Sequence, residues 1–267
     1  MRFSTPAIAL VRRMSRSYSS CLRENAAAVI DVALATRQHE AYVAALRDAG
    51  VETRFVDPAD ELPDACFVED TAVITGAHAL LTIPGATSRQ AEGRMVAPAL
   101  ALACEVVPMT GSARLDGGDV LRVGDRLFVG LSARTNVEGA DALADVAARD
   151  GLTVTKVPLR AGLHLKSACT IASPSLVLCD ASALDDETMA ALRSTGSELL
   201  VVPEPHGANA LALGDRTLVS RAAPRTAELL VKRGLRVEAL DLSEIHAGDG
   251  ALTCLSLRVP PVGAWCA

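Results

Sequence analysis

Apolar and polar positions recur in the same order twice along the chain, about ninety residues apart. The first copy covers residues 115–154 and the second covers residues 208–237. Each copy contains an apolar strand pattern, a Gly-Asp-Arg turn, a second apolar strand, an Arg-Thr pair, a helical pattern and a Gly-Leu-x-Val strand. The shared order predicts a ββαβ unit that is repeated along the chain.

Three looser copies of this pattern complete the chain. Two of them cover residues 68–107 and 165–202, with helices expected over residues 88–103 and 187–194. The last is split, because residues 249–259 would complete a strand at residues 8–11, a helix at 36–49 and a strand at 52–56. Five units of about 45–50 residues, closed by pairing the chain ends, predict an α/β fold: a five-unit ββαβ pseudo-symmetric propeller with its helices outside. We therefore expect residues 1–267 to form a single domain.

Composition and charge exclude several classes of protein. Half of the 267 residues are hydrophobic but only 3% are aromatic, so Ala, Val and Leu must build a globular core. The net charge is −6, and no cluster of basic residues extends beyond Arg12-Arg13, so nucleic acid is not an expected partner. No run approaches the ~18 apolar residues of a transmembrane helix, which indicates a protein without a membrane partner.

The seven cysteines show no C-x-x-C pair, and an odd number cannot all pair within one chain. This usage is typical of reduced thiols in the cytoplasm, which is the location we expect. The Arg- and Ser-rich residues 1–20 could suggest a targeting peptide, but residues 8–11 fit a first core strand better. No spacing of His and Cys forms a closed ligand set, so neither a metal nor another cofactor is expected.

Several polar residues open the first strand of each predicted unit. If these strands point inward, a thiol, histidines and carboxylates meet at the axis, namely Glu69, Asp70, Asp116, Asp119, His164, His206, Asn209, Asp249 and Cys254. Strand alternation over residues 253–259 places Cys254 on a polar face with Ser256 and Arg258. This combination indicates nucleophilic catalysis on a cationic substrate.

Each of these residues also has a simpler interpretation. Cys254 alone fits a small buried hydrophobe, and His164 fits a core histidine. Asp116-Gly-Gly-Asp119 fits a turn whose glycines adopt positive φ. His206 caps a turn or lies at the channel mouth, and His246 is expected at the surface. The common meeting point of the repeated units favours the functional interpretation.

Five motifs occur in an order that matches a known family. They are Asp64-Ala-Cys-Phe-Val-Glu69-Asp70-Thr, Leu115-Asp116-Gly-Gly-Asp119-Val, Leu131-Ser-Ala-Arg134-Thr-Asn136, Leu163-His164-Leu-Lys166-Ser and Asp249-Gly-Ala-Leu-Thr-Cys254. Together they resemble dimethylarginine dimethylaminohydrolase, a family of the pentein superfamily of guanidine-modifying enzymes. The resemblance covers nearly the whole chain and implies the pentein fold, a five-unit α/β propeller.

The resemblance also implies a role for each matching residue. Cys254 corresponds to the nucleophile, His164 to the general acid and base, and Asp116 to the residue that orients His164. Asp70 corresponds to the carboxylate that pairs with the guanidinium, with Asp249 and Glu69 beside it.

The other end of the substrate has its own matches. Arg89 and Arg134 correspond to a clamp on the α-carboxylate. Asp64 and the backbone of Leu22 correspond to contacts with the α-amino group. Leu22 lies in the polar segment 15–25, which we expect to act as a lid.

The implied reaction is hydrolysis of asymmetric dimethylarginine and monomethylarginine to citrulline and dimethylamine or methylamine, through a thiouronium on the cysteine. The partner is therefore a small molecule, and the sequence leaves open whether the chain forms a homodimer. One alternative is an arginine deiminase, although those enzymes typically carry Asp two residues after the catalytic His, where this chain has Lys166. Another is a non-catalytic pentein binding module, which would lack the pair His164 and Cys254.

Overall fold

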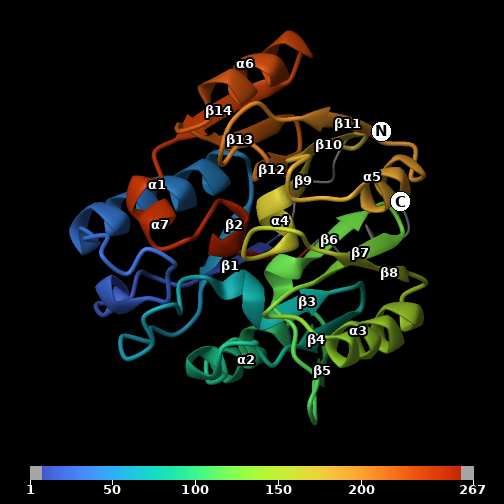
Figure 1. Cartoon of the computed structure of the whole chain (residues 1–267). Coiled ribbons are helices and arrows are strands. Elements are labelled where there is room, and N and C mark those ends of the chain that lie inside the picture. Colours follow the sequence, from blue (N-terminus) through green and yellow to red (C-terminus); the bar gives the residue numbers. More distant parts are fainter. Residues whose placement is uncertain (1–7, 260–267) are drawn as a thin grey trace.

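Five three-stranded sheets surround a common centre in the computed structural model, which describes residues 8–259 (Figure 1). In every sheet the middle strand pairs antiparallel with one neighbour and parallel with the other. This is the strand arrangement of a ββαβ unit, and it confirms the predicted five-unit α/β propeller. Residues 1–7 and 260–267, which include Cys266 and the start of segment 1–20, lie outside the described residues.

The five sheets follow one another along the chain, and the strands within each sheet are short. Their bounds are β3 (Ala72–Ile74), β4 (His78–Leu81) and β5 (Glu105–Pro108); β6 (Val120–Val123), β7 (Arg126–Leu131) and β8 (Thr153–Pro158); β9 (Cys169–Ser173), β10 (Leu176–Cys179) and β11 (Glu198–Val201); β12 (Leu211–Leu213), β13 (Arg216–Ser220) and β14 (Arg236–Leu240); and β15 (Leu257–Val259), β1 (Ile8–Val11) and β2 (Glu52–Phe55).

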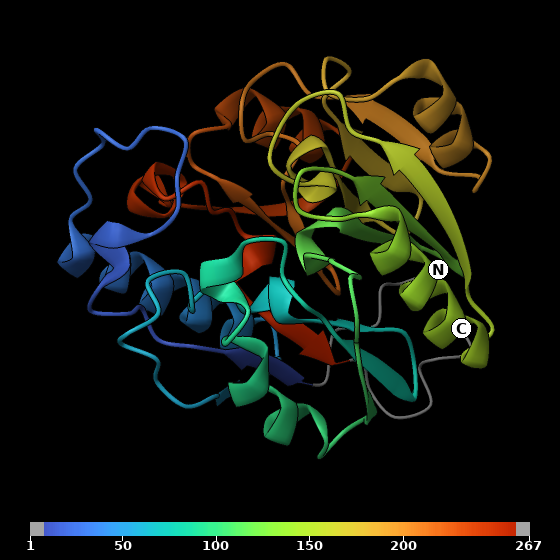
Figure 2. The ribbon, with the colours of Figure 1, turned by 60° about the horizontal axis from the view of Figure 1, so that its bottom comes forward.

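The last of these sheets closes the ring by joining both ends of the chain. Strand β15 pairs antiparallel with β1, with Arg258 opposite Ala9 and Leu257 opposite Leu10. Figure 2 shows the red C-terminal strand beside the blue N-terminal one. The predicted split unit, with strands near residues 8–11 and 52–56, is therefore confirmed.

The connecting helices lie at the periphery of the ring (Figure 1). They are α1 (Val32–Asp48), α2 (Ala97–Leu100), α3 (Val137–Arg149), α5 (Asp186–Arg193) and α6 (Pro224–Lys232), whereas α4 (Leu165–Ala168) is a short turn near the centre and α7 (Ser243–Ala247) is a short helix beside α1. Side chains of Asp31, Asn136 and Asp185 cap the first turns of α1, α3 and α5 by accepting backbone N–H bonds. None of the helices within residues 8–259 is long and apolar enough to cross a membrane.

The repeated Gly-Asp-Arg sequence has a local physical reason. It forms the two-residue turns between β6 and β7 and between β12 and β13. Gly124 and Gly214 open these turns with φ values of 63° and 60°. Such a backbone conformation strains any residue with a Cβ, so glycine recurs at both positions.

Two details of the sequence prediction are wrong. The helix expected over residues 88–103 is broken into 3-10 turns at Thr87–Arg89 and Gly93–Met95 followed by the short α2. Pro98, which lacks an N–H, lies in the first turn of α2, where no helix bond is lost. Cys254 does not belong to the alternating strand either, because Thr253–Leu255 forms a 3-10 turn before β15.

Candidate active site

A pocket of about 310 Å³ opens near the middle of the ring. Its walls come from segments far apart in the sequence, namely Leu22, Asp64, Phe67, Asp70, Arg89, Arg134, Leu163, His164, Gly248, Asp249, Gly250 and Cys254. Every predicted site residue except Asp116 and Glu69 lines this pocket. The ring therefore brings the predicted residues together.

Short helical turns that precede the first strand of a unit position the central side chains. Asp70 lies in the 3-10 turn Val68–Thr71 before β3, and Cys254 lies in the turn before β15. His164 is the N-cap residue of α4, which leads into β9. Equivalent points of three units thus supply a carboxylate, a thiol and an imidazole to one pocket.

Gly117 and Gly118 allow these turns to approach one another closely. A Cβ at Gly118 would lie 2.7 Å from His164 Nδ1 and 2.9 Å from Asp70 Oδ1. A Cβ at Gly117 would collide with the carbonyl oxygen of Glu69. Neither glycine is among the described residues with positive φ, so the interpretation of this motif as a left-handed turn is wrong. The glycines provide space rather than backbone freedom.

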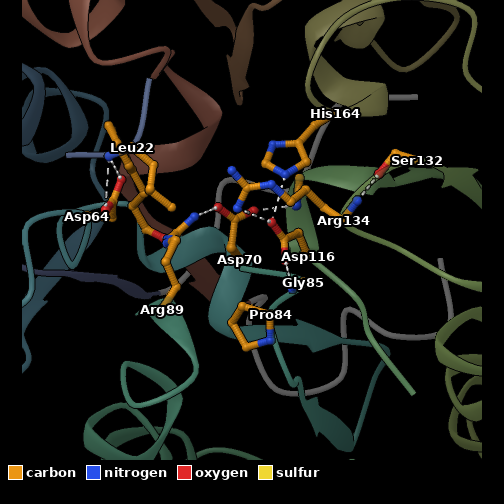
Figure 3. A network of polar contacts seen from close by, with 12 residues as sticks. Leu22, Asp64, Asp70, Pro84, Gly85, Arg89, Asp116, Ser132, Arg134 and His164 are labelled. Carbon is orange, nitrogen blue, oxygen red and sulfur yellow. Dashed lines mark hydrogen bonds and ion pairs between the residues drawn. The ribbon is translucent and has the colours of Figure 1, made fainter. Parts of the chain in front are cut away.

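His164 is buried against a carboxylate at the base of the pocket. Its Nε2 lies 2.9 Å from Asp116 Oδ2, and the fully buried Asp116 also accepts a bond from the Gly85 N–H (Figure 3). Burial by itself would lower the pKa of His164, but the nearby charge of Asp70 and the bond to Asp116 raise it to about 9. At neutral pH the ring is therefore an imidazolium.

Asp70 is the most firmly held carboxylate of the pocket. Its Oδ2 accepts from Arg89 Nη1 at 2.7 Å and its Oδ1 accepts from the Gly118 N–H at 2.8 Å. Burial opposes ionisation, but the charges of His164 and Arg89 lower the pKa of Asp70 to about 2. Asp70 therefore presents a permanent negative charge in the pocket.

Two arginines approach this carboxylate cluster. Figure 3 shows Asp70, Asp116 and His164 grouped between Arg89 and Arg134. Arg134 Nη1 lies 4.0 Å from Asp116 Oδ2. Arg89 is buried, and besides Asp70 it donates to both carboxylate oxygens of Glu92 and to the carbonyl of Phe67.

The rim of the pocket is formed by the predicted lid segment. The Leu22 N–H donates to Asp64 Oδ1 at 3.1 Å, and the Glu24 N–H donates to Asp249 Oδ2 at 2.6 Å. Burial raises the pKa of Asp64. Residues 22–24 are thus attached to both sides of the pocket mouth.

Cys254 is half-buried, and it lines the pocket. Burial, together with the negative charges of Glu69 and Asp70, raises the pKa of its thiol to about 12. The group is therefore a neutral thiol when the pocket holds no cation. A bound cation would oppose the effect of the carboxylates and favour the thiolate.

Comparison with known proteins decides the family. Residues 15–256 match the sequence profile described as N,N dimethylarginine dimethylhydrolase, eukaryotic. The chain belongs to the dimethylarginine dimethylaminohydrolase family. The enzyme of that name from Streptomyces coelicolor is 41% identical over 232 residues, which cover 86% of this chain and 88% of that protein.

Solved structures of dimethylarginine dimethylaminohydrolases share the fold. A Cys-to-Ser variant of the Pseudomonas aeruginosa enzyme, in complex with citrulline, is 29% identical with a TM-score of 0.89, covering 96% of this chain and all of that one. A His-to-Gly variant that forms an adduct with S-methyl-L-thiocitrulline is also 29% identical, with a TM-score of 0.88 and coverage of 95% and 99%. The predicted membership of the pentein superfamily is confirmed.

Glu69 and Lys166 lie behind the pocket rather than in its wall. Lys166 Nζ donates to Glu69 Oε1 at 2.7 Å and to the Gly117 carbonyl at 3.1 Å. Arg258 Nη2 lies 3.5 Å from the same Glu69 oxygen. Glu69 Oε2 is buried and has no hydrogen-bond partner within residues 8–259. In this family member, Lys166 neutralises a buried carboxylate beside the cysteine.

One cluster within the described residues has the composition of a metal site. Asp70, Asp116 and His164 offer ligand atoms that all lie within 4.8 Å of one another. However, an imidazolium carries a proton on both ring nitrogens and cannot coordinate a cation. With a pKa of about 9 for His164, the cluster suits a guanidinium better than a metal at neutral pH.

Sequence reasoning missed some residues that shape the site. Four further residues line the pocket, namely Phe67, Leu163, Gly248 and Gly250. Each lies within three positions of a predicted site residue. Their neighbourhood in sequence was the available signal. Asp119, which was expected at the axis, is fully buried behind the pocket, where it accepts bonds from the Ser132 and Thr135 hydroxyls and from the Leu165 N–H.

Proposed function

We propose that this protein hydrolyses Nω-methylated L-arginines, both asymmetric dimethylarginine and monomethylarginine, to citrulline and dimethylamine or methylamine. The observation that carries the proposal is the meeting of the Cys254 thiol, the His164 imidazolium and the Asp70 carboxylate in one pocket of a dimethylarginine dimethylaminohydrolase family member. A nucleophile, an acid and a counter-charge are what displacement of an amine from a guanidinium requires. The reaction needs no cofactor.

The pocket can hold both ends of the substrate. Asp70 pairs with the guanidinium nitrogens, while Glu69 and Asp249 add negative charge nearby. Asp64 and the backbone of Leu22 contact the α-amino group. The Asp70 carboxylate therefore favours a planar cation and fixes it beside the sulfur.

The two arginines bind the α-carboxylate unequally. Arg89 uses one N–H on Nε, one on Nη1 and two on Nη2 for Glu92, Asp70 and Phe67, so one of its five remains for a ligand. Arg134 has its guanidinium near Asp116 at 4.0 Å, which is a weak contact. We therefore assign the forked contact with the substrate carboxylate to Arg134 and a single N–H to Arg89.

The first chemical step forms a bond to sulfur. The bound cation lowers the pKa of Cys254, the thiol releases its proton to solvent, and the thiolate attacks the guanidinium carbon. The His164 imidazolium then donates its Nδ1 proton to the methylated nitrogen, and the carbon–nitrogen bond breaks. A neutral His164 and a cationic thiouronium on Cys254 remain, together with free amine.

The second step returns the enzyme to its starting state. Neutral His164 takes a proton from water, and the hydroxide adds to the thiouronium carbon. The carbon–sulfur bond breaks, the sulfur leaves as a thiolate, and this thiolate regains a proton from solvent when citrulline is released. One further proton leaves the hydroxyl group and is taken up by the free amine. Throughout both steps Asp116 holds the ring by its Nε2.

Lys166 distinguishes this proposal from an arginine deiminase. The residue places an ammonium, bound to Glu69, where those enzymes typically have a carboxylate. Unmethylated N–H donors on that side of the guanidinium would lack an acceptor, whereas methyl groups need none. Methylated substrates should therefore be preferred.

We test the function by measuring citrulline formation from arginine, monomethylarginine, asymmetric dimethylarginine and symmetric dimethylarginine in parallel. The expected kcat/KM is highest for the monomethyl and asymmetric dimethyl compounds, since symmetric dimethylarginine places a methyl on the edge held by Asp70. Fastest turnover of arginine with release of ammonia would establish a deiminase instead. Absence of turnover with every substrate would support a binding module.

We further propose that residues 1–267 act as one catalytic domain in the cytoplasm, with a small molecule rather than nucleic acid as partner. The closed ring of five sheets supports the single domain. The six cysteines within the described part of the chain are unpaired, which suits a reducing compartment.

A further inference from the structure

His246 is tied into the structure by both nitrogens of its ring. It lies on α7, half-buried rather than at the surface as expected, with Nδ1 2.9 Å from the Gly250 carbonyl oxygen. Its Nε2 lies 2.8 Å from Ser220 Oγ. Because a carbonyl only accepts, Nδ1 carries the proton and Nε2 accepts from the serine hydroxyl. The contacts select one neutral tautomer of a histidine that the reaction does not use.

The residues held by this ring form part of the pocket wall. Gly248, Asp249 and Gly250 all line the pocket. Asp249 has a φ of 57°, a left-handed conformation that two backbone bonds fix at the end of α7, from the Asp249 N–H to the His246 carbonyl and from the Gly250 N–H to the Ile245 carbonyl. Its Oδ2 accepts the Glu24 N–H at 2.6 Å. Asp249 therefore links the pocket wall to the lid segment 22–24.

The opposite side of residues 248–250 is closely packed. A Cβ at Gly250 would lie 2.3 Å from the Phe67 ring, and one at Gly248 would lie 2.4 Å from Tyr18 Oη. These contacts limit movement toward the protein interior but supply no polar partner for the Gly250 carbonyl. The bond from His246 supplies that partner and fixes the peptide between Gly250 and Ala251, directly after the turn that carries Asp249.

We propose that His246 is a positioning residue for substrate binding, and that its bond to the Gly250 carbonyl holds the turn 248–250 in the pocket wall, with the Asp249 carboxylate placed to anchor the lid segment. The proposal rests on the function proposed above. Asp249 then presents its carboxylate to Glu24 and keeps residues 22–24 over the pocket mouth. Without the bond, the turn 248–250 shifts in the pocket wall and the lid segment loses its attachment.

The reacting groups are held by other contacts. Cys254 lies in the turn that the Thr253 N–H attaches to Asn209 Oδ1 at 3.2 Å. His164 is held by Asp116 in another unit. Loss of the His246 bond should therefore weaken binding and leave the chemical step intact, so KM rises while kcat is retained.

Two substitutions separate positioning from simple packing. His246→Leu fills the space without a donor, whereas the side-chain amide of His246→Asn can donate from near the Nδ1 position. We expect the Leu variant to raise KM for asymmetric dimethylarginine about tenfold, with kcat within about twofold, as for the loss of one hydrogen bond. The Asn variant should stay within about threefold of wild type in KM.

A matched control tests the other contact of the ring. His206 stacks on His246 with ring centroids 3.8 Å apart, and it is exposed with a φ of 61°. Asn tolerates that conformation, so His206→Asn removes the stacked ring without new backbone strain. Its KM should equal that of wild type, because the bond to Gly250 remains.

The dissociation constant of citrulline, measured by calorimetry, tests binding to the same pocket wall without catalysis. We expect it to rise about tenfold in the Leu variant and to recover in the Asn variant. An unchanged KM and Kd in His246→Leu would overturn the proposal, as would equal losses in the Leu and Asn variants or a fall in kcat alone. Wild-type protein that forms no citrulline but binds it would reject the proposed function, while the Kd comparison still tests His246.

Discussion

His164 Nε2 lies 2.9 Å from Asp116 Oδ2, and this contact determines which ring nitrogen can exchange a proton with a substrate. Because the buried carboxylate engages Nε2, Nδ1 is the nitrogen available for the acid and base roles. The same environment keeps the ring protonated at neutral pH, with a pKa of about 9. In the free enzyme the acid His164 is thus already protonated, while Cys254 remains a thiol until a cation binds.

Replacing the nucleophile should abolish the reaction without disturbing the fold. Cys254→Ser is nearly isosteric, but its hydroxyl does not ionise near neutral pH and does not attack the guanidinium. We expect citrulline formation below about one-hundredth of wild type, with unchanged circular dichroism and melting temperature. Residual activity above that level would assign the nucleophile to another residue.

Removing His164, the acid and base, should stop the reaction after the covalent intermediate has formed. In His164→Gly the analogue S-methyl-L-thiocitrulline can still react with Cys254, because its methanethiolate leaves without a proton from the imidazole, but no imidazole remains to activate water. A thiouronium adduct should accumulate, detectable by mass spectrometry of acid-quenched protein. The double variant that also carries Cys254→Ser is the control and should stay unmodified. If Cys254 is unmodified at all times in His164→Gly, the division of roles is incorrect.

The sequence predicted the ring and most of the pocket because both depend on repeated features. The order of strand, turn and helix recurs, so the five sheets and even the split unit with β15 and β1 were predictable. Cys254, His164 and Asp70 lie in motifs that open each unit. The 3-10 turns that hold Cys254 and Asp70 were not predicted, since three or four residues show no periodicity.

Contacts between distant side chains were also beyond sequence reasoning. Lys166 and Glu69 are 97 residues apart, and only the packing of two units brings them together. The same holds for His246 and Ser220, which come from the short helix α7 and the end of strand β13. Tertiary geometry selects such partners, and no local pattern encodes them.

The space at Gly118 gives a third prediction. In Gly118→Ala the new methyl would meet His164 Nδ1 and Asp70 Oδ1 at less than 3 Å, so the acid and the carboxylate must separate. We expect kcat/KM to fall at least about hundredfold, because small displacements of catalytic groups are costly. Gly124→Ala is the control, since its φ of 63° is strained but its Cβ meets nothing within 4 Å. It should lose about 1 kcal/mol of stability and keep full activity.

The two raised pKa values predict the pH dependence of the reaction. The active form contains a Cys254 thiolate and a His164 imidazolium, one proton fewer than the free enzyme carries below pH 9. Lowering the proton concentration therefore raises kcat/KM about tenfold per pH unit until His164 titrates at a pKa of about 9. Above that pH the free enzyme and the active form carry equal numbers of protons, so kcat/KM levels off.

Alkylation of Cys254 by iodoacetamide should behave differently in the same range. This reagent needs only the thiolate, whose pKa is about 12, so its rate should continue to rise beyond pH 9. For the kcat/KM profile, a substrate analogue that lacks the α-amino group serves as the control. With this analogue, a titration near pH 9 belongs to His164 and not to the substrate. A plateau in kcat/KM below pH 8 would contradict an elevated pKa for His164. An alkylation rate that also levels off at pH 8 or 9 would show that the carboxylates Glu69 and Asp70 do not hold Cys254 in its thiol form.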